Sequence, residues 1–239
     1  MSATTAATTP SRPNGFRDAT RVLTSVLAPL EKRTLIWLAK RMPPRVNSDH
    51  LTALALVAML GAGLSYWLAS WTPAGLLLAI LFLAINWFGD SLDGTLARVR
   101  QHQRPRYGYY IDHIVDAFGA LFLFSGLALS GYMSPVIAVG LLLAYFMLSI
   151  EVYLAAHSVG QFKISYFKMG PTELRILLAI GNLVLLVHPD ATLFGHVFKL
   201  FDVGGAIGIV GLFVTLIVST VSNTRTLYRA EPIPGTRDR

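Results

Sequence analysis

Six apolar runs in this chain are each long enough to cross a lipid bilayer, which takes about 20 residues in a helix. The chain has 239 residues, of which 54% are hydrophobic and only 14% are charged. A soluble domain carries about 25% charged residues, so this deficit indicates an integral membrane protein. We therefore predict an all-α membrane protein with six transmembrane helices, near residues 51–71, 74–97, 109–132, 135–158, 171–188 and 202–224.

The segment before the first apolar run is basic and amphipathic. Its apolar residues recur at helical spacing over residues 18–44, and Lys and Arg interrupt them. This pattern is typical of a helix that lies at the membrane interface, and a helical cap packed on the bundle is the alternative. Residues 1–17 lack the apolar core of a signal peptide and are expected to form a disordered tail. The six-helix domain is then expected over 45–228, followed by a cytoplasmic tail over 229–239.

The distribution of Lys and Arg predicts the orientation. Apart from Lys199, these residues lie in the N-terminal segment, the 98–106 loop, the 160–175 region and the C-terminal end. Cytoplasmic loops are enriched in basic residues, so we expect both termini in the cytoplasm, and the protein in a bacterial or archaeal cytoplasmic membrane. Contact with anionic lipid accounts for the net charge of +7 without a nucleic-acid partner. The absence of cysteine excludes disulfides and thiolate metal ligands.

Four aspartates occupy the ends of two successive apolar runs. Asp90 and Asp93 are three residues apart, and Asp112 and Asp116 are four apart, so each pair lies on one face of a helix. The short loop between the runs lets the helices return as antiparallel neighbours, with all four carboxylates at one depth. Clustered carboxylates repel one another unless cations lie between them, and oxygen ligands suit hard ions such as Mg²⁺, Mn²⁺ or Ca²⁺. We therefore predict a site at the cytoplasmic rim of the membrane for two ions, Mg²⁺ or Mn²⁺.

Two other uses of these aspartates have to be weighed. They are also placed to form interfacial salt bridges with Arg98, Arg100, Arg104 and Arg106. Four carboxylates at matched depth and helical spacing favour the metal site over such pairing. A divalent-cation transporter would carry polar groups onward to the far face, whereas residues 117–132 contain only Ser125 and Ser130 as ordinary polar groups.

Small residues and one arginine surround the aspartates. Gly94 and Ala97 lie beside Asp93, and Gly108 lies one turn before the third aspartate. Residues without a bulky side chain allow a ligand to approach the backbone, and Arg98 can offer a bidentate contact to phosphate. Metal-binding carboxylates, small residues and an arginine together suit a substrate that carries a pyrophosphate. Ordinary helix packing is the alternative role for each glycine.

Taken in order, these residues resemble the signature of the CDP-alcohol phosphotransferase family. The matching residues read Asp90-x-x-Asp93-Gly94-x-x-Ala97-Arg98 and then Gly108-x-x-x-Asp112-x-x-x-Asp116. The plan of six crossings after an amphipathic helix is also similar to the family. The resemblance implies a membrane enzyme of phospholipid synthesis, which moves a substituted phosphate group from a CDP-alcohol to an acceptor hydroxyl and releases CMP.

The resemblance also implies roles for individual residues. The four aspartates would bind the metal ions, and Asp116 would also be the general base for the acceptor hydroxyl. A carboxylate within hydrogen-bond reach of that hydroxyl can take its proton. Ser48 and Asp49 stand where the family has Pro and Asn, at the start of the first crossing. The residues expected around the CDP moiety are Asp93, Gly94, Ala97, Arg98 and Gly108.

The acceptor half of the site is less defined. Lys168 and Arg175 could form a basic pocket for a phosphorylated or anionic acceptor, and salt bridges of Arg175 with Glu151 or of Lys168 with Glu173 are the alternative. His113 resembles the histidine of the choline and ethanolamine phosphotransferase branch, where it is a candidate base. Neighbouring residues do not share a helix face, so packing is an equally good role for His113.

The sequence leaves open the class of CDP donor and whether the chain forms a homodimer. The basic pair favours CDP-diacylglycerol attacked by a small polar alcohol, and the alternative is CDP-choline or CDP-ethanolamine attacked by diacylglycerol. A stripe of small residues on the last run allows close helix contact, within the chain or in a homodimer. The stripe consists of Gly204, Gly205, Gly208 and Gly211.

Overall fold

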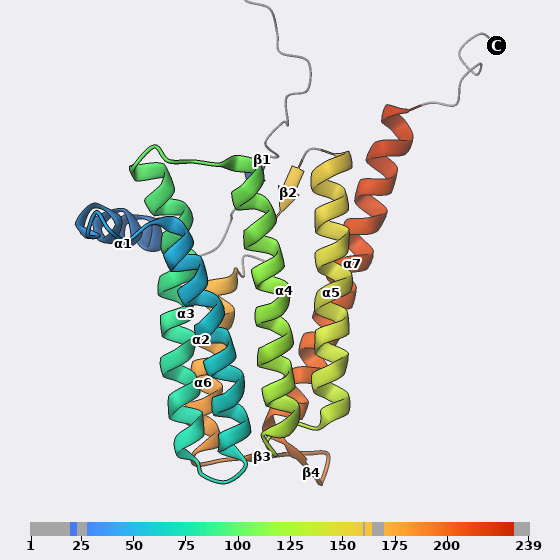
Figure 1. The fold of residues 1–239 in the computed structure, drawn as a ribbon. Coiled ribbons are helices and arrows are strands. Elements are labelled where there is room, and N and C mark those ends of the chain that lie inside the picture. Colours follow the sequence, from blue (N-terminus) through green and yellow to red (C-terminus); the bar gives the residue numbers. More distant parts are fainter. Residues whose placement is uncertain (1–19, 23–27, 160, 164–169, 232–239) are drawn as a thin grey trace, which may run out of the picture.

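The protein is a bundle of long helices with one helix lying across it (Figure 1). The computed structural model describes residues 20–22, 28–159, 161–163 and 170–231. The helices in this part are α1 (Ala28–Arg41), α2 (Ser48–Ala69), α3 (Ala74–Val99), α4 (Pro105–Leu129), α5 (Pro135–Ser158), α6 (Pro171–Leu185) and α7 (Leu200–Ala230). The strands form a parallel pair, β1 (Thr20–Val22) with β2 (Gln161–Lys163), and an antiparallel pair, β3 (Asp190–Leu193) with β4 (His196–Lys199).

Local sequence signals explain where several helices begin. Pro105, Pro135 and Pro171 lie at the starts of α4, α5 and α6, where a missing N–H and a fixed φ are both compatible with a helix. The side chain of Asn47 accepts a hydrogen bond from the backbone N of His50 at 3.0 Å. This contact caps α2, because it satisfies one of the N–H groups left free in the first turn.

Among the described residues, five helices are long and apolar enough to cross a membrane: α2, α3, α4, α5 and α7. They indicate an integral membrane protein. The expected fifth crossing, near 171–188, forms α6, which has 15 residues and is about 22 Å long. That is shorter than the roughly 30 Å of a hydrocarbon core. Figure 1 nevertheless shows α6 beginning part way along the bundle and returning the chain toward the end where α7 starts.

Helix α2 lies at the centre of the packing. It packs against both α3 and α4, while α6 packs on α3, α5 on α4 and α7 on α5. The close approach depends on glycine: a Cβ on Gly126 would lie 2.1 Å from the carbonyl O of Gly63, and one on Gly63 would lie 2.3 Å from that of Phe122. The core between the helices includes Tyr66, Leu76, Leu83, Leu123, Leu127 and Leu185.

Helix α1 covers only the second part of the expected 18–44 helix, because Thr20–Val22 form β1 and α1 begins at Ala28. Leu35 and Ala39 are buried against Leu92 and Leu96 of α3. The opposite face is exposed and carries the basic residues Lys32, Arg33, Lys40 and Arg41. The expected tail at 1–17, and the chain beyond residue 231, lie outside the described residues.

The connections between the helices are divided between the two ends of the bundle as the charge pattern predicts. The α3–α4 connection and the end of α7 lie at one end, whereas the α2–α3 turn, the α4–α5 turn and the β3–β4 hairpin lie at the other (Figure 1). The hairpin was not expected from the sequence. It contains Lys199, which pairs in register with Asp190, so the one exception to the basic pattern sits opposite an acidic residue.

Candidate functional site

The four aspartates come from α3 and α4 and converge at one end of the bundle. The two helices run antiparallel, as expected, but both pack on α2 and make few direct contacts with each other. Asp116 interacts electrostatically with Asp90, Asp112 and Asp93, and Asp93 also interacts with Asp90 and Asp112. The sequence spacing predicted that these carboxylates share one region of the bundle, and they are near enough there to interact electrostatically. Their role as metal ligands stays a prediction.

Asp93 is held by residues at the start of α2. Thr52 Oγ1 donates a hydrogen bond to Asp93 Oδ2 at 2.6 Å, and Ser48 Oγ donates to the backbone O of Asp93 at 2.9 Å. Asp93 Oδ1 also accepts from the backbone N of Gly94. Asp93 is 9% exposed, so these donors replace water around a carboxylate that lies almost inside the protein.

Asp90 is held by α6. Arg175 Nη2 forms an ion pair with Asp90 Oδ2 at 2.6 Å, and Arg175 Nε donates to Asn86 Oδ1 at 2.8 Å. Asn86 Nδ2 in turn donates to the backbone O of Ala55 at 3.0 Å. Arg175 Nη1 is buried and makes no hydrogen bond to any residue that the structure describes. This buried donor, near Asp90, therefore has hydrogen-bonding capacity that no described residue uses.

These contacts bear on the metal prediction. Within the described ranges, no three acidic or His side chains are close enough together to hold an ion. Arg175 contacts Asp90 and Thr52 contacts Asp93. The donor set still fits a hard divalent cation, because it consists of four carboxylates that repel one another. An ion would have to compete with Arg175 for Asp90.

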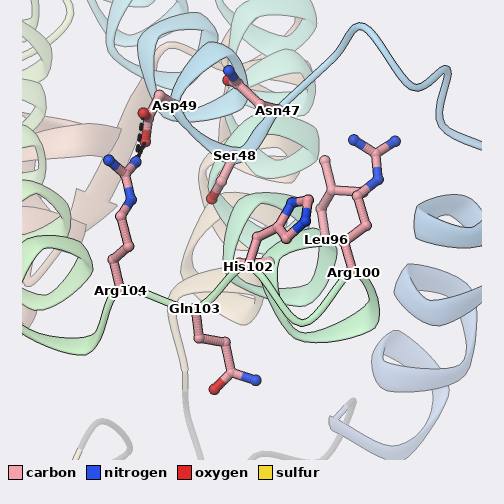
Figure 2. Close-up of a pocket in the computed structure, with 9 residues that line it drawn as sticks. Asn47, Ser48, Asp49, Leu96, Arg100, His102, Gln103 and Arg104 are labelled. Carbon is pink, nitrogen blue, oxygen red and sulfur yellow. Dashed lines mark hydrogen bonds and ion pairs between the residues drawn. The ribbon is translucent and has the colours of Figure 1, made fainter.

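A cavity of about 450 Å³ lies at the start of α2 and the α3–α4 connection (Figure 2), and none of the four aspartates is among its lining residues. Ser48 lines it and also contacts Asp93, and Ala97, from the expected CDP-binding set, lines it too. No other group lies within 4 Å of where a Cβ on Gly108 would stand, and only Arg98 lies within that distance at Gly94. The remaining lining residues are Asn47, Asp49, Leu96, Arg100, His102, Gln103 and Arg104.

The arginines near the cavity have partners other than those considered from the sequence. Arg104 reaches Asp49 across the cavity wall, with both carboxylate oxygens 2.6 Å from Nη2 (Figure 2). The pair raises the pKa of Arg104 above its usual value, first through the hydrogen bond with Asp49. Arg100 donates to the backbone carbonyls of Met42, Pro43 and Val46. Arg98 Nη2 donates to Thr95 Oγ1 at 2.9 Å.

The structure places two of the three residues that were expected to bind the acceptor. Arg175 lies beside the aspartates and pairs with Asp90 rather than with Glu151, which accepts hydrogen bonds from Ser219 and Asn223 of α7. The His113 ring packs against Tyr109 and Tyr153, with ring centroids 4.1 and 4.6 Å away. Lys168 lies outside the described residues.

The sequence did not predict the contacts by which three polar residues hold the site: Ser48, Thr52 and Asn86. Ser48 and Thr52 lie in the stretch that resembles the family's start of the first crossing, but no contact with Asp93 was expected from it. Asn86 interrupts an apolar run four residues before Asp90, and a polar side chain inside a membrane helix is itself a signal of function.

Comparison with known proteins identifies the family of the chain. The sequence model of a protein family described as CDP-alcohol phosphatidyltransferase matches residues 46–218, which is more than half of the chain. The matched region includes all four aspartates, Arg175 and the residues around the cavity. A comparison with curated protein sequences gives no match.

Proposed function

The chain belongs to the CDP-alcohol phosphatidyltransferase family, and we propose that it transfers the phosphatidyl group of CDP-diacylglycerol to the hydroxyl of a small polar alcohol. Members of the family are phosphotransferases that use a CDP-alcohol donor and an alcohol acceptor, and they generally depend on divalent cations. The donor, the acceptor and the roles of single residues are the proposed part.

The observation that carries the proposal is the meeting of four carboxylates, a polar cavity and a buried arginine donor at one end of the bundle. Asp90, Asp93, Asp112 and Asp116 would hold Mg²⁺ or Mn²⁺. When bound, such ions neutralise the charge of a pyrophosphate and of its transition state. Ser48 supports placing the donor next to the metals, because it lines the cavity and contacts the backbone of Asp93.

The cavity beside Ala97 would receive the cytidine end of the donor. Its lining offers hydrogen-bond donors and acceptors from Asn47, His102 and Gln103, which suits a polar heterocycle and a ribose better than an acyl chain. Gly94, Arg98 and Gly108 would then lie along the pyrophosphate. The acyl chains of the donor would remain in the lipid, beside the exposed apolar faces of the bundle.

In the reaction, the acceptor oxygen forms a bond to the phosphorus of the phosphatidyl group. The bond from that phosphorus to the oxygen of CMP breaks, and CMP leaves with the electron pair. Asp116 takes the hydroxyl proton, so that the attacking oxygen does not become positively charged. Asp116 suits this role because it interacts electrostatically with the other carboxylates and with the positive charge of Arg175.

Arg175 favours an anionic or polar acceptor. Its buried Nη1 makes no hydrogen bond to any described residue, and a guanidinium binds phosphate or hydroxyl oxygens well. Diacylglycerol presents one hydroxyl and no charge, so the alternative reaction, with CDP-choline or CDP-ethanolamine as donor, would leave this buried donor unused. This contrast is the reason for preferring CDP-diacylglycerol.

The test is a CMP-release assay with purified protein in lipid. One arm supplies CDP-diacylglycerol with a panel of polar and phosphorylated alcohols, and the other supplies CDP-choline or CDP-ethanolamine with diacylglycerol. We expect CMP only in the first arm, and we expect Arg175→Lys to raise the KM of the acceptor. CMP release confined to the second arm would reject the proposed donor.

A further inference from the structure

One carboxylate outside the aspartate cluster joins three helices. The Oε1 atom of Glu31 on α1 accepts hydrogen bonds from Trp87 Nε1 at 2.8 Å and Ser91 Oγ at 3.2 Å, both on α3. The same atom accepts from Thr172 Oγ1 on α6 at 2.6 Å. Three donors that converge on one oxygen make this carboxylate a link between α1, α3 and α6.

We propose that Glu31 is a positioning residue that holds the first turn of α6 on α3 and thereby keeps Arg175 against Asp90. Ser91 directly follows Asp90, and Thr172 lies one turn before Arg175. The Glu31 contacts and the Arg175–Asp90 pair therefore join the same two helices at adjacent turns. The functional part of this inference rests on the proposed role of Arg175 in acceptor binding.

The position of α6 in the bundle explains why such a contact would stabilise its first turn. It begins part way along the bundle (Figure 1), so its first turn lies against other helices instead of extending beyond them. The positive end of its dipole faces Glu31, and a carboxylate near a helix N-terminus is stabilising. At the other end of α6, Tyr66 Oη donates to Asn182 Oδ1 at 3.0 Å, so each end of the helix has a polar anchor.

The packing of α1 on the bundle fixes the position of Glu31. Leu35 and Ala39 are one and two turns further along α1, and both are buried against α3. Lys32 and Arg33, the next residues in the chain, are exposed. The buried face of α1 therefore fixes Glu31 over the start of α6, and the exposed neighbours provide matched control positions on the same helix.

A distance measurement tests the positioning role without any assay of activity. The chain contains no cysteine, so spin labels can be placed at Leu81 on α3 and Leu177 on α6, which are 53% and 56% exposed. In the full chain in lipid nanodiscs, we expect a narrow distance distribution that broadens in Glu31→Ala and in Thr172→Val. Glu31→Gln should broaden it less, because the amide oxygen still accepts hydrogen bonds, and Lys32→Ala should leave it unchanged. A distribution that stays narrow in both Glu31→Ala and Thr172→Val would overturn the proposal.

A kinetic measurement then tests the consequence for the site. We expect Glu31→Ala to raise the KM of the acceptor by about tenfold, as for the loss of a hydrogen bond to a charged group. The KM of the CDP donor should not change, because the proposed donor residues lie on α3, on α4, in their connection and at the start of α2, and none lies on α6. Adding Thr172→Val to Glu31→Ala should have no further effect, since both changes break the same contact.

Arg175→Lys, assayed in parallel, separates the two proposals. If it raises the acceptor KM and Glu31→Ala does not, the positioning role is wrong. If neither variant changes the acceptor KM, the proposed acceptor role of Arg175 fails, and the spin-label distances still decide whether Glu31 holds α6.

Discussion

At the scale of single residues, the four aspartates differ in what surrounds them. Asp90 is neutralised by Arg175, and Asp93 is tied to α2 by Thr52. Asp116 faces both the other carboxylates and the charge of Arg175. Because the first two carboxylates already have strong partners, Asp116 is the better candidate for a group that gains and loses a proton during each turnover.

The Asp116→Asn variant tests this assignment. Asparagine keeps the shape of aspartate and one oxygen ligand but cannot take a proton. We expect turnover to fall by about 100-fold or more, while binding of the CDP donor, measured by equilibrium dialysis with a labelled analogue, persists. His113→Gln is the matched control and should keep most activity, because His113 packs between two tyrosines.

Two outcomes would change the assignment. Near-normal turnover in Asp116→Asn would move the base elsewhere, with His113 as the next candidate. Loss of donor binding together with turnover would show that Asp116 serves mainly as a metal ligand.

Removal of divalent cations gives a second prediction at this scale. Carboxylates that cluster without enough cationic partners require a counter-ion, and here Arg175 is the cation that faces Asp90. CMP release should stop in EDTA and return with excess Mg²⁺ or Mn²⁺. Full turnover in the chelator, after prior dialysis against it, would contradict the metal site.

The residues of this site were predictable to different degrees. Spacing alone predicted that Asp90, Asp93, Asp112 and Asp116 would meet, since helical periodicity fixes which residues share a face. It did not predict that Arg175 would pair with Asp90, because the partners are 85 residues apart and only the packing of α6 on α3 brings them together. Thr52 and Glu31 were missed for the same reason.

At the scale of helices, glycine controls how closely α2 and α4 pack. Gly63 and Gly126 face each other, and a Cβ on either would overlap backbone atoms of the other helix. Backbone cannot move aside as a flexible side chain does. The stripe on α7 is different: Gly205 and Gly208 pack on α5, whereas nothing lies within 4 Å of a Cβ at Gly211. The contact within the chain thus uses only part of the stripe.

Gly126→Ala should therefore destabilise the bundle by about 1–3 kcal/mol, the usual cost of overpacking a core. The measurement is the midpoint of thermal unfolding in detergent, followed by tryptophan fluorescence. Gly211→Ala is the control, because it adds the same methyl group in the middle of a helix with open space around it. An equal midpoint for the two variants would contradict the close α2–α4 contact.

The helices were more predictable than their ends. The run at 135–158 matches α5 residue for residue, because Pro135 marks its start and its first 14 residues are apolar. Helix α6 is shorter than expected, because the apolar residues of its run continue past the point where the helix ends. The β3–β4 hairpin, which follows α6 within 171–199, was not predicted from the sequence. β1 shortened the expected N-terminal helix, and the backbone pairing of Thr20–Val22 with Gln161–Lys163 has no signal in local sequence.

At the scale of the whole molecule, charge is divided between the two ends of the bundle. The end that holds the cavity and the aspartates also holds the basic residues of α1 and of the α3–α4 connection. At the other end, Lys199 is opposite Asp190 in the hairpin, and Trp67 and Trp71 are exposed near the α2–α3 turn. Exposed tryptophans are typical of a membrane interface.

This division predicts that the aspartate end faces the cytoplasm, as the positive-inside rule requires. Because the chain lacks cysteine, single cysteines can be placed at Gln103 and Ser158 on that end and at Phe194 on the hairpin, where the side chain is 100% exposed. In intact cells, a membrane-impermeant maleimide should label Phe194→Cys and leave Gln103→Cys and Ser158→Cys unlabelled until the cells are opened. Labelling of Gln103→Cys in intact cells, with Phe194→Cys protected, would reverse the orientation. It would also place the carboxylates on the side of the membrane away from a cytoplasmic pool of nucleotide-activated donors, so the orientation and the proposed reaction are tested together.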